Sequence, residues 1–130
     1  MGTIKILIAD DEVVIADIMA KKVREAGFEV MVTYDGQLAW EQIQVFKPDV
    51  IVLDLTMPGM DGWEVLKNLR ANSPSKQWIP VIIVSANTEF EHIQQGITLE
   101  ADHYLTKPCK VEDVIKSIRL MLNLAAQRNV

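Results

Sequence analysis

The sequence predicts an α/β domain built on a buried parallel β-sheet. Short, β-branched apolar runs at residues 4–9, 50–53 and 81–84 are typical of strands that are buried on both faces of such a sheet. Between these runs the apolar residues recur at helical spacing, which indicates repeated strand–helix–strand units. A polar residue follows each run, at the edge of the sheet where binding sites form in this class of fold.

The first predicted helix follows the first strand and ends at Gly27, because glycine is common just after helix C-termini. Four apolar residues at helical spacing form its inward stripe: Ile15, Met19, Val23 and Ala26. Residues 28–33 follow as a second strand, and their partial alternation of polar and apolar side chains suggests a position at the edge of the sheet.

A second helix is predicted between a turn at residues 35–36 and a stop at residues 47–48, where a proline disfavours further helix. Its apolar stripe consists of Ala39, Ile43 and Phe46. A third strand at residues 50–53 and a loop come next, and Asp61 with Glu64 has the spacing of a capping box that starts a third helix. That helix carries Trp63, Leu66 and Leu69.

The last part of the chain is predicted to hold two strands and two helices. The fourth strand covers residues 79–84, and Thr88 with Glu91 is predicted to cap a fourth helix. A short fifth strand follows at residues 104–106. The stripe of the fifth helix is Val111, Val114, Ile118, Met121 and Ala125. Five strands and five helices fill 130 residues, a length suited to a single domain.

The composition of the chain argues against some classes of binding partner and favours one cell compartment. Thirteen basic and eighteen acidic residues give a net charge of −5, which argues against direct binding to nucleic acid or to an anionic membrane. The apolar runs have strand length, and no secretion signal opens the chain. Cys109 is the single cysteine, so an internal disulfide is impossible and a reducing compartment is favoured. We therefore expect a cytoplasmic protein without nucleic-acid or membrane partners.

The polar residues at the strand ends form one chemical set. Asp10 and Asp11 follow the first strand, Asp54 the third, Ser85 the fourth and Lys107 the fifth. The parallel sheet would gather these groups in one crevice. Three close carboxylates repel one another unless a cation sits among them or one takes up a proton. Oxygen ligands suit Mg²⁺ or Mn²⁺, so the set indicates a site for a divalent cation and a phosphoryl group.

Four motifs in this order carry a family resemblance: Ile8-Ala9-Asp10-Asp11-Glu12, the run VLDLTMPGMDG at residues 52–62, Val84-Ser85-Ala86, and the run YLTKP at residues 104–108. Over essentially its whole length the chain resembles the receiver domain of two-component response regulators, of which the chemotaxis receiver is an example. The resemblance implies a single receiver domain over residues 1–130. It also implies a flavodoxin-like doubly wound sheet with the strand order 2-1-3-4-5.

The resemblance further implies that Asp54 accepts a phosphoryl group from a sensor histidine kinase or a phosphotransfer protein, in a reaction that depends on Mg²⁺, with Mn²⁺ as the alternative ion. Asp11 and Asp54 would bind the metal directly, the carbonyl of Thr56 would add a ligand, and Asp10 would act through water. A domain of this kind is a signalling module and no enzyme, because it promotes only its own phosphotransfer and dephosphorylation.

A switch is implied as well. Lys107 would hold a phosphoryl oxygen opposite the metal, aimed by a cis peptide bond at Pro108. Ser85 would offer its hydroxyl to the phosphoryl group with Ala86 beside it, and Tyr104 would pack inward as Ser85 moves. The surface of the fourth helix, fifth strand and fifth helix would then change and control an output protein or a fused output domain.

Two other functions use a similar fold or chemistry. A phosphatase of the haloacid dehalogenase type needs a second aspartate two residues after the nucleophile, where this chain has Thr56. A flavin-binding flavodoxin needs hydroxyl and glycine donors after the first strand, where residues 10–12 are acidic and would repel a phosphate. His92 and His103 are interpreted as surface residues. Whether the receiver acts alone or belongs to a longer regulator stays open.

Overall fold

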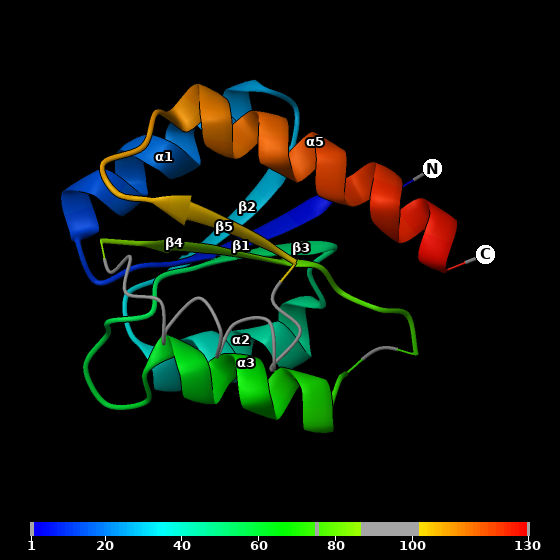
Figure 1. The fold of residues 1–130 in the computed structure, drawn as a ribbon, viewed down its shortest axis with the longest axis horizontal. Helices are drawn as coiled ribbons and strands as arrows, with labels where there is room; N and C mark the ends of the chain where they lie inside the picture. The colour runs from blue at the N-terminus through cyan, green and yellow to red at the C-terminus, as the bar shows by residue number, and fades with distance from the viewer. Residues whose placement is uncertain (1, 75, 87–101, 130) are drawn as a thin grey trace.

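The computed structural model describes residues 2–74, 76–86 and 102–129. A five-stranded parallel sheet runs through their centre in the order β2-β1-β3-β4-β5 (Figure 1). Its strands are β1 (Lys5–Ala9), β2 (Glu29–Thr33), β3 (Val50–Leu53), β4 (Val81–Ser85) and β5 (His103–Thr106). The predicted fold class and strand order are therefore confirmed, as is the predicted edge position of the second strand.

Helices cover both faces of the sheet. The pair α1 (Val13–Glu25) and α5 (Val111–Arg128) lies on one face, and the pair α2 (Gly36–Phe46) and α3 (Gly62–Ala71) lies on the other (Figure 1). The predicted fourth helix, with its caps Thr88 and Glu91 and with His92, lies outside the described residues. The described residues thus contain four of the five predicted helices.

Two apolar layers hold the sheet between these helix pairs. Leu7, Ile51 and Ile83 belong to the layer under α2 and α3. Ile8 and Val52 belong to the layer under α1 and α5. Successive strand residues point to opposite faces, so a strand that is covered on both sides is apolar at every position. This burial explains why β3 and β4 were visible as apolar runs and why β1 is apolar at every position after Lys5.

Local signals placed most helix ends correctly. The carboxylate of Asp61 accepts a hydrogen bond from the backbone N–H of Glu64 at 2.9 Å and caps α3 as predicted. Gly27 has a φ of +105° just after the end of α1. Lys47, directly after α2, is also left-handed with a φ of +52°. No helix among the described residues is long and apolar enough to cross a bilayer.

The predicted inward stripe of α1 was partly wrong. Ile15 is 46% exposed, whereas Ala16 and Ala20 are buried together with Met19 and Val23. The N-terminal half of α1 carries more apolar residues than one face can bury, and the small alanines occupy the face nearest the sheet. The spacing of apolar residues therefore predicted burial of Ile15, whereas the adjacent Ala16 is the residue that is buried.

The predicted turn at Asp35-Gly36 is the start of α2. The carboxylate of Asp35 accepts a hydrogen bond from the N–H of Leu38 at 2.7 Å, which caps the helix. Gly36 is its first residue, and a Cβ there would lie 1.6 Å from the carbonyl oxygen of Met60. The glycine lets α2 begin in close contact with the loop between β3 and α3, which a local sequence reading does not reveal.

Candidate functional site

The predicted site residues meet at the carboxyl edge of the sheet. A pocket at this edge is lined by Asp11, Glu12, Asp54, Thr56, Ser85, Ala86 and Lys107. Asp10 lies beside it, because its carboxylate contacts Lys107. The structure therefore brings together the side chains that the sequence placed after the first, third, fourth and fifth strands.

Asp54 is held in place by its backbone and by the loop that follows it. Its N–H donates to the carbonyl of Ala9 at 2.9 Å, which extends the pairing of β1 with β3. Its carboxylate oxygen Oδ1 accepts a hydrogen bond from the N–H of Thr56 at 3.2 Å. Gly62 folds back beneath it, and a Cβ on Gly62 would lie 2.2 Å from the carbonyl oxygen of Asp54. The side chain is buried as a result.

The two adjacent aspartates after β1 have different surroundings. Asp10 is 3% exposed, and its Oδ1 accepts a hydrogen bond from the N–H of Glu12 at 2.9 Å. Asp11 is exposed and lines the pocket. The bend after the strand thus turns one carboxylate into the protein and leaves its neighbour facing solvent at the rim.

Lys107 contacts three carboxylates at once. Its Nζ lies 2.9 Å from Asp10 Oδ2, 2.9 Å from Glu12 Oε1 and 3.1 Å from Asp54 Oδ2. The backbone N–H of Lys107 donates to the carbonyl of Ser85 at 2.8 Å, and the peptide bond to Pro108 is cis, as the resemblance implied. One ammonium group therefore joins residues from the ends of β1, β3 and β5.

The electrostatics of the site leave negative charge uncompensated. Burial, and then the nearby charge of Asp10, raise the pKa of Asp54 to about 6, although the N–H of Thr56 and the ammonium of Lys107 act in the opposite direction. Burial alone would lower the pKa of Lys107, but its bonds with Asp10 and Glu12 raise it, so the lysine stays charged. Three carboxylates that share one ammonium favour an additional cation.

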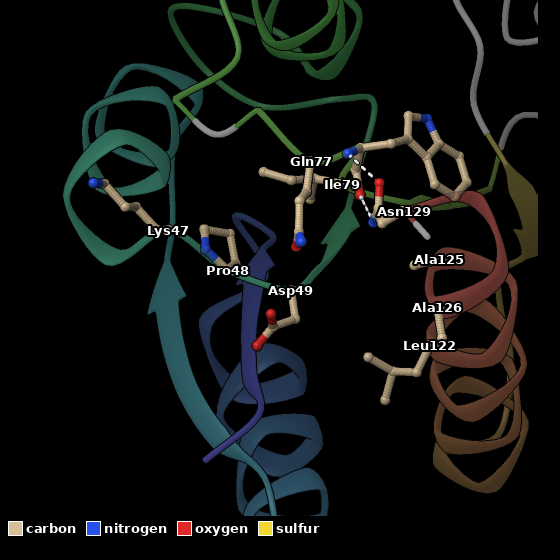
Figure 2. Close-up of a pocket in the computed structure, with 10 residues that line it drawn as sticks. Lys47, Pro48, Asp49, Gln77, Ile79, Leu122, Ala125, Ala126 and Asn129 are labelled. Atoms are coloured by element: carbon tan, nitrogen blue, oxygen red, sulfur yellow. Dashed lines mark hydrogen bonds between the residues drawn. The ribbon is translucent and has the colours of Figure 1, made fainter. Parts of the chain in front are cut away.

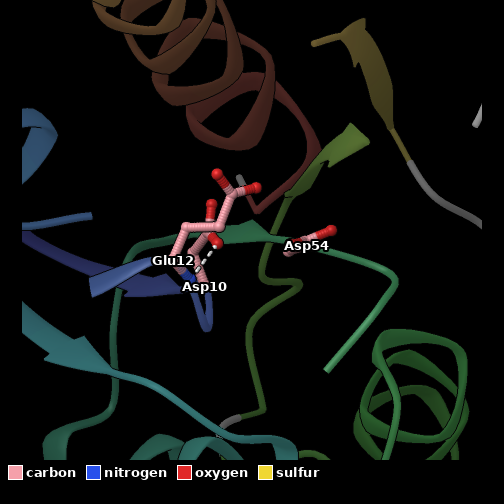
Figure 3. A group of neighbouring side chains, drawn as sticks. All are labelled: Asp10, Glu12 and Asp54. Atoms are coloured by element: carbon pink, nitrogen blue, oxygen red, sulfur yellow. Dashed lines mark hydrogen bonds between the residues drawn. The ribbon is translucent and has the colours of Figure 1, made fainter. Parts of the chain in front are cut away.

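The donor set fits a hard divalent cation. One carboxylate oxygen from each of Asp10, Glu12 and Asp54 lies within 4.8 Å of the other two. Figure 3 shows Asp10 and Glu12 just past the end of one strand and Asp54 past the end of a neighbouring strand. Carboxylate oxygens are the ligands that Mg²⁺ prefers in proteins. Asp11 and Thr56 line the same pocket as Glu12 and Asp54, which leaves both available to an ion bound there.

Glu12 is the site residue that the sequence reading missed. It was assigned to the start of the following helix, where an acidic side chain is favoured by the helix dipole. Glu12 does occupy the N-cap position of α1, but its side chain makes no capping hydrogen bond. It contacts Lys107 instead. The available signal was the third consecutive acidic residue in Asp10-Asp11-Glu12.

The predicted switch residues Ser85 and Tyr104 contact each other. Ser85 is buried at the end of β4, and Tyr104 on β5 packs against the apolar layer under α2 and α3. Burial raises the pKa of Tyr104, while a side-chain hydrogen bond with Ser85 lowers it. Ala86 is exposed and lines the pocket. The helix expected to follow Ser85 lies outside the described residues.

A second pocket lies at the opposite edge of the sheet, beside the last turns of α5 (Figure 2). Asp49 accepts a hydrogen bond there from the N–H of Lys5 at 2.8 Å, and Lys47 points away from the other lining side chains. Trp78 and Asn129 are joined by two hydrogen bonds, of 2.9 and 3.2 Å. The hydrogen bonds of Asp49, Trp78 and Asn129 join segments that are distant in the sequence, so we interpret this pocket as structural.

Comparison with known proteins agrees with this geometry. The family model of the response regulator receiver domain matches residues 6–119. The probable transcriptional regulatory protein TcrX of Mycobacterium tuberculosis is 34% identical over 119 residues, which cover 92% of this chain and 50% of that protein. The sensory transduction protein RegX3 of Mycolicibacterium smegmatis is 38% identical over 125 residues, covering 95% and 53%. The chain spans about half the length of the curated relatives it matches.

Solved structures give the same result. The receiver domain of the Francisella response regulator 1452 is 35% identical, with a TM-score of 0.85 and coverage of 94% of this chain and 98% of that one. The Vibrio cholerae chemotaxis protein CheY4, crystallized at low pH, is 31% identical, with a TM-score of 0.86 and coverage of 93% and 100%. Together with the acidic site at the carboxyl edge of the sheet, these matches show that the chain belongs to the response regulator receiver domain family, whose members are phosphoacceptor signalling domains.

Proposed function

We propose that Asp54 accepts a phosphoryl group from a sensor histidine kinase or a phosphotransfer protein, in a reaction that requires Mg²⁺ or Mn²⁺. The observation that supports this assignment most strongly is the surroundings of Asp54. It is a buried carboxylate at a strand end, faced by the ammonium of Lys107 and crowded by two further carboxylates. A carboxylate attacks phosphorus usefully only where the charge on the phosphoryl oxygens is offset.

In the proposed reaction a carboxylate oxygen of Asp54 forms a bond to phosphorus while the bond from phosphorus to the donor histidine breaks. The N–H of Thr56 holds Oδ1 of Asp54 and so orients the carboxylate. Lys107 places positive charge where the phosphoryl oxygens arrive. A divalent cation, when bound, would neutralise charge on those oxygens from a second side.

The proposed ligands of the cation are Asp11 and Asp54 directly, the carbonyl of Thr56, and Asp10 through water. The exposed Asp11 can turn toward an ion in the adjoining pocket without leaving a buried partner unpaired. Asp10 is already bonded to Lys107 and to the N–H of Glu12, which suits a role one water molecule away from the ion. We also propose that the domain promotes only its own phosphotransfer and dephosphorylation.

The proposed output is a change on the surface formed by β5, α5 and the helix expected after Ser85. The contact between Ser85 and Tyr104, and the bond from Lys107 to Asp54, are the elements that a phosphoryl group would rearrange. The names of some relatives describe transcriptional or DNA-binding regulators. For this chain we propose that the changed surface controls an output protein or a fused output domain. We also propose that the receiver itself does not bind nucleic acid and that it acts in the cytoplasm.

The test is labelling with a small phosphoryl donor. Acetyl phosphate or phosphoramidate with Mg²⁺ should add one phosphoryl group, detected by intact-mass spectrometry and mapped by reductive trapping of the acyl phosphate. The labelling should disappear in Asp54→Asn and in excess chelator. A mass adduct that persists in Asp54→Asn would reject Asp54 as the acceptor, and full labelling in chelator would reject the metal requirement.

A further inference from the structure

Glu12 has a contact that the proposed phosphotransfer does not use. Its Oε1 lies 2.9 Å from Nζ of Lys107, although the side chain is 51% exposed. The residue occupies the N-cap position of α1 but makes no side-chain capping bond. Its backbone N–H is held by Asp10 at 2.9 Å, so the start of the side chain is anchored beside the site. The carboxylate is therefore directed at Lys107 and does not serve the helix.

The three contacts of Lys107 use all the donors that an ammonium group possesses. A lysine ammonium has three N–H donors and no acceptor. In the structure it has three carboxylate partners, Asp10, Glu12 and Asp54, each within 3.1 Å. A phosphoryl oxygen on Asp54 needs one of these donors, so one of the present partners has to be released.

The cost of release differs between the partners. Asp10 is 3% exposed, and loss of the ammonium would leave a buried carboxylate with one remaining partner among the described residues, the N–H of Glu12. Releasing a buried charge is costly, whereas a half-exposed carboxylate regains water when it is released. Glu12 is the only one of the three whose side chain is more than half exposed. Glu12 is thus the partner that Lys107 can exchange at the lowest cost.

We propose that Glu12 is a positioning residue that competes with the phosphoryl group for Lys107. It holds the ammonium toward the end of β1 and gives up this contact when a phosphoryl oxygen on Asp54 takes its place. The charge of Glu12 then sets how readily the domain enters its phosphorylated state. This inference rests on the proposed function, because it assigns a regulator of the same site.

The test compares Glu12→Gln with the parent protein in binding of beryllofluoride, which forms a phosphoryl-like adduct with an aspartate carboxylate. Calorimetric titration at saturating Mg²⁺ removes differences in metal affinity from the comparison. Since an exposed ion pair is worth little, we expect about two- to fivefold tighter binding in Glu12→Gln. Glu25→Gln, which removes the same charge from the other end of α1, should bind like the parent.

A double-mutant cycle with Lys107→Ala shows whether Glu12 acts through the lysine. The gain from Glu12→Gln should vanish in the Lys107→Ala background, because the group that is competed for is then missing. An equal gain in both backgrounds would overturn the proposal and assign the effect to general charge repulsion. Unchanged or weaker binding in Glu12→Gln would also overturn it. If the parent itself fails to bind beryllofluoride, the proposed function fails instead.

Discussion

Asp54 and Asp102 are two largely buried aspartates, and they are stabilised in different ways. Asp54 lies at the carboxyl ends of the parallel strands and Asp102 at their amino ends. Burial raises the pKa of both. The carboxylate of Asp102 accepts a hydrogen bond from the N–H of Val81 at 2.7 Å and pairs with the guanidinium of Arg70 at 2.9 Å. Asp102 therefore has a paired guanidinium, the nearby positive charge of Arg128 and a backbone donor, and it ties α3 to the beginning of β4 and β5.

Within the described part of the chain, Asp54 has no cation that pairs with it alone. It shares the ammonium of Lys107 with Asp10 and Glu12, and its hydrogen bond from Thr56 is longer, at 3.2 Å. The negative charge of Asp102 is nearly balanced by its paired guanidinium. Around Asp54, three carboxylates share one ammonium, so negative charge is in excess. The comparison indicates how a buried carboxylate is recognised as structural or as reactive: the reactive one has unbalanced neighbours that a cation and a phosphoryl group can complete.

The largest expected effect is on labelling by acetyl phosphate. Asp54→Asn should lose the phosphoryl adduct completely, since the amide cannot act as nucleophile. Asp102→Asn should keep it, because Asp102 lies at the other edge of the sheet, where its partners are Arg70 and Val81. Intact-mass spectrometry measures both. Equal loss in a folded Asp102→Asn protein would contradict the separation of the two sites.

The free energy of unfolding should depend more on Asp102 than on Asp54, the reverse of the labelling result. Asp102→Ala should lower the free energy of unfolding by about 3 kcal/mol, because it removes the carboxylate that pairs with the guanidinium of Arg70 and accepts the hydrogen bond from the N–H of Val81. Asp54→Ala should cost far less or stabilise the protein, since it relieves the repulsion from Asp10. Urea unfolding measured in chelator gives both values. A larger loss in Asp54→Ala would assign Asp54 to the structural group.

Mg²⁺ should stabilise the folded protein by binding only at the Asp54 edge. At ten times the dissociation constant the gain is about 1.4 kcal/mol by mass action. Asp11→Asn should remove most of this gain while its metal-free form melts no lower than the parent, because Asp11 is exposed. Thermal unfolding with and without Mg²⁺ tests this. A metal-free Asp11→Asn protein that is strongly destabilised would show a structural role for Asp11.

The smallest expected effect is the pH dependence of stability that arises from Asp102. Because burial raises the pKa of Asp102, the folded state binds a proton there more tightly than the unfolded chain. This contribution to stability therefore grows as the pH falls through the raised pKa toward the ordinary value of 3.8, and it is lost as the pH rises. Asp102→Asn should flatten this part of the profile, measured by urea unfolding. An unchanged slope would assign the dependence to other groups.

The sequence by itself determined the architecture and the main chemical set. A sheet that is buried on both faces requires apolar strands with no alternation, and parallel strands bring their carboxyl ends to one edge. These two rules were enough to predict a buried parallel sheet and to place Asp54 and Lys107 at one site, whereas the strand order was implied by the resemblance to receiver domains. Helix ends with local chemistry, such as the cap formed by Asp61, were also readable because all their partners lie within a few residues.

Only the tertiary structure decided which neighbours these residues meet. The direction of Asp10 against Asp11 depends on the bend after β1, and the turn of Glu12 away from its helix depends on Lys107, 95 residues later in the chain. The need for glycine at position 36 comes from the backbone of Met60 on another loop. Periodicity and motifs describe a residue's own segment, whereas charge balance and close contact depend on segments that only the fold brings together.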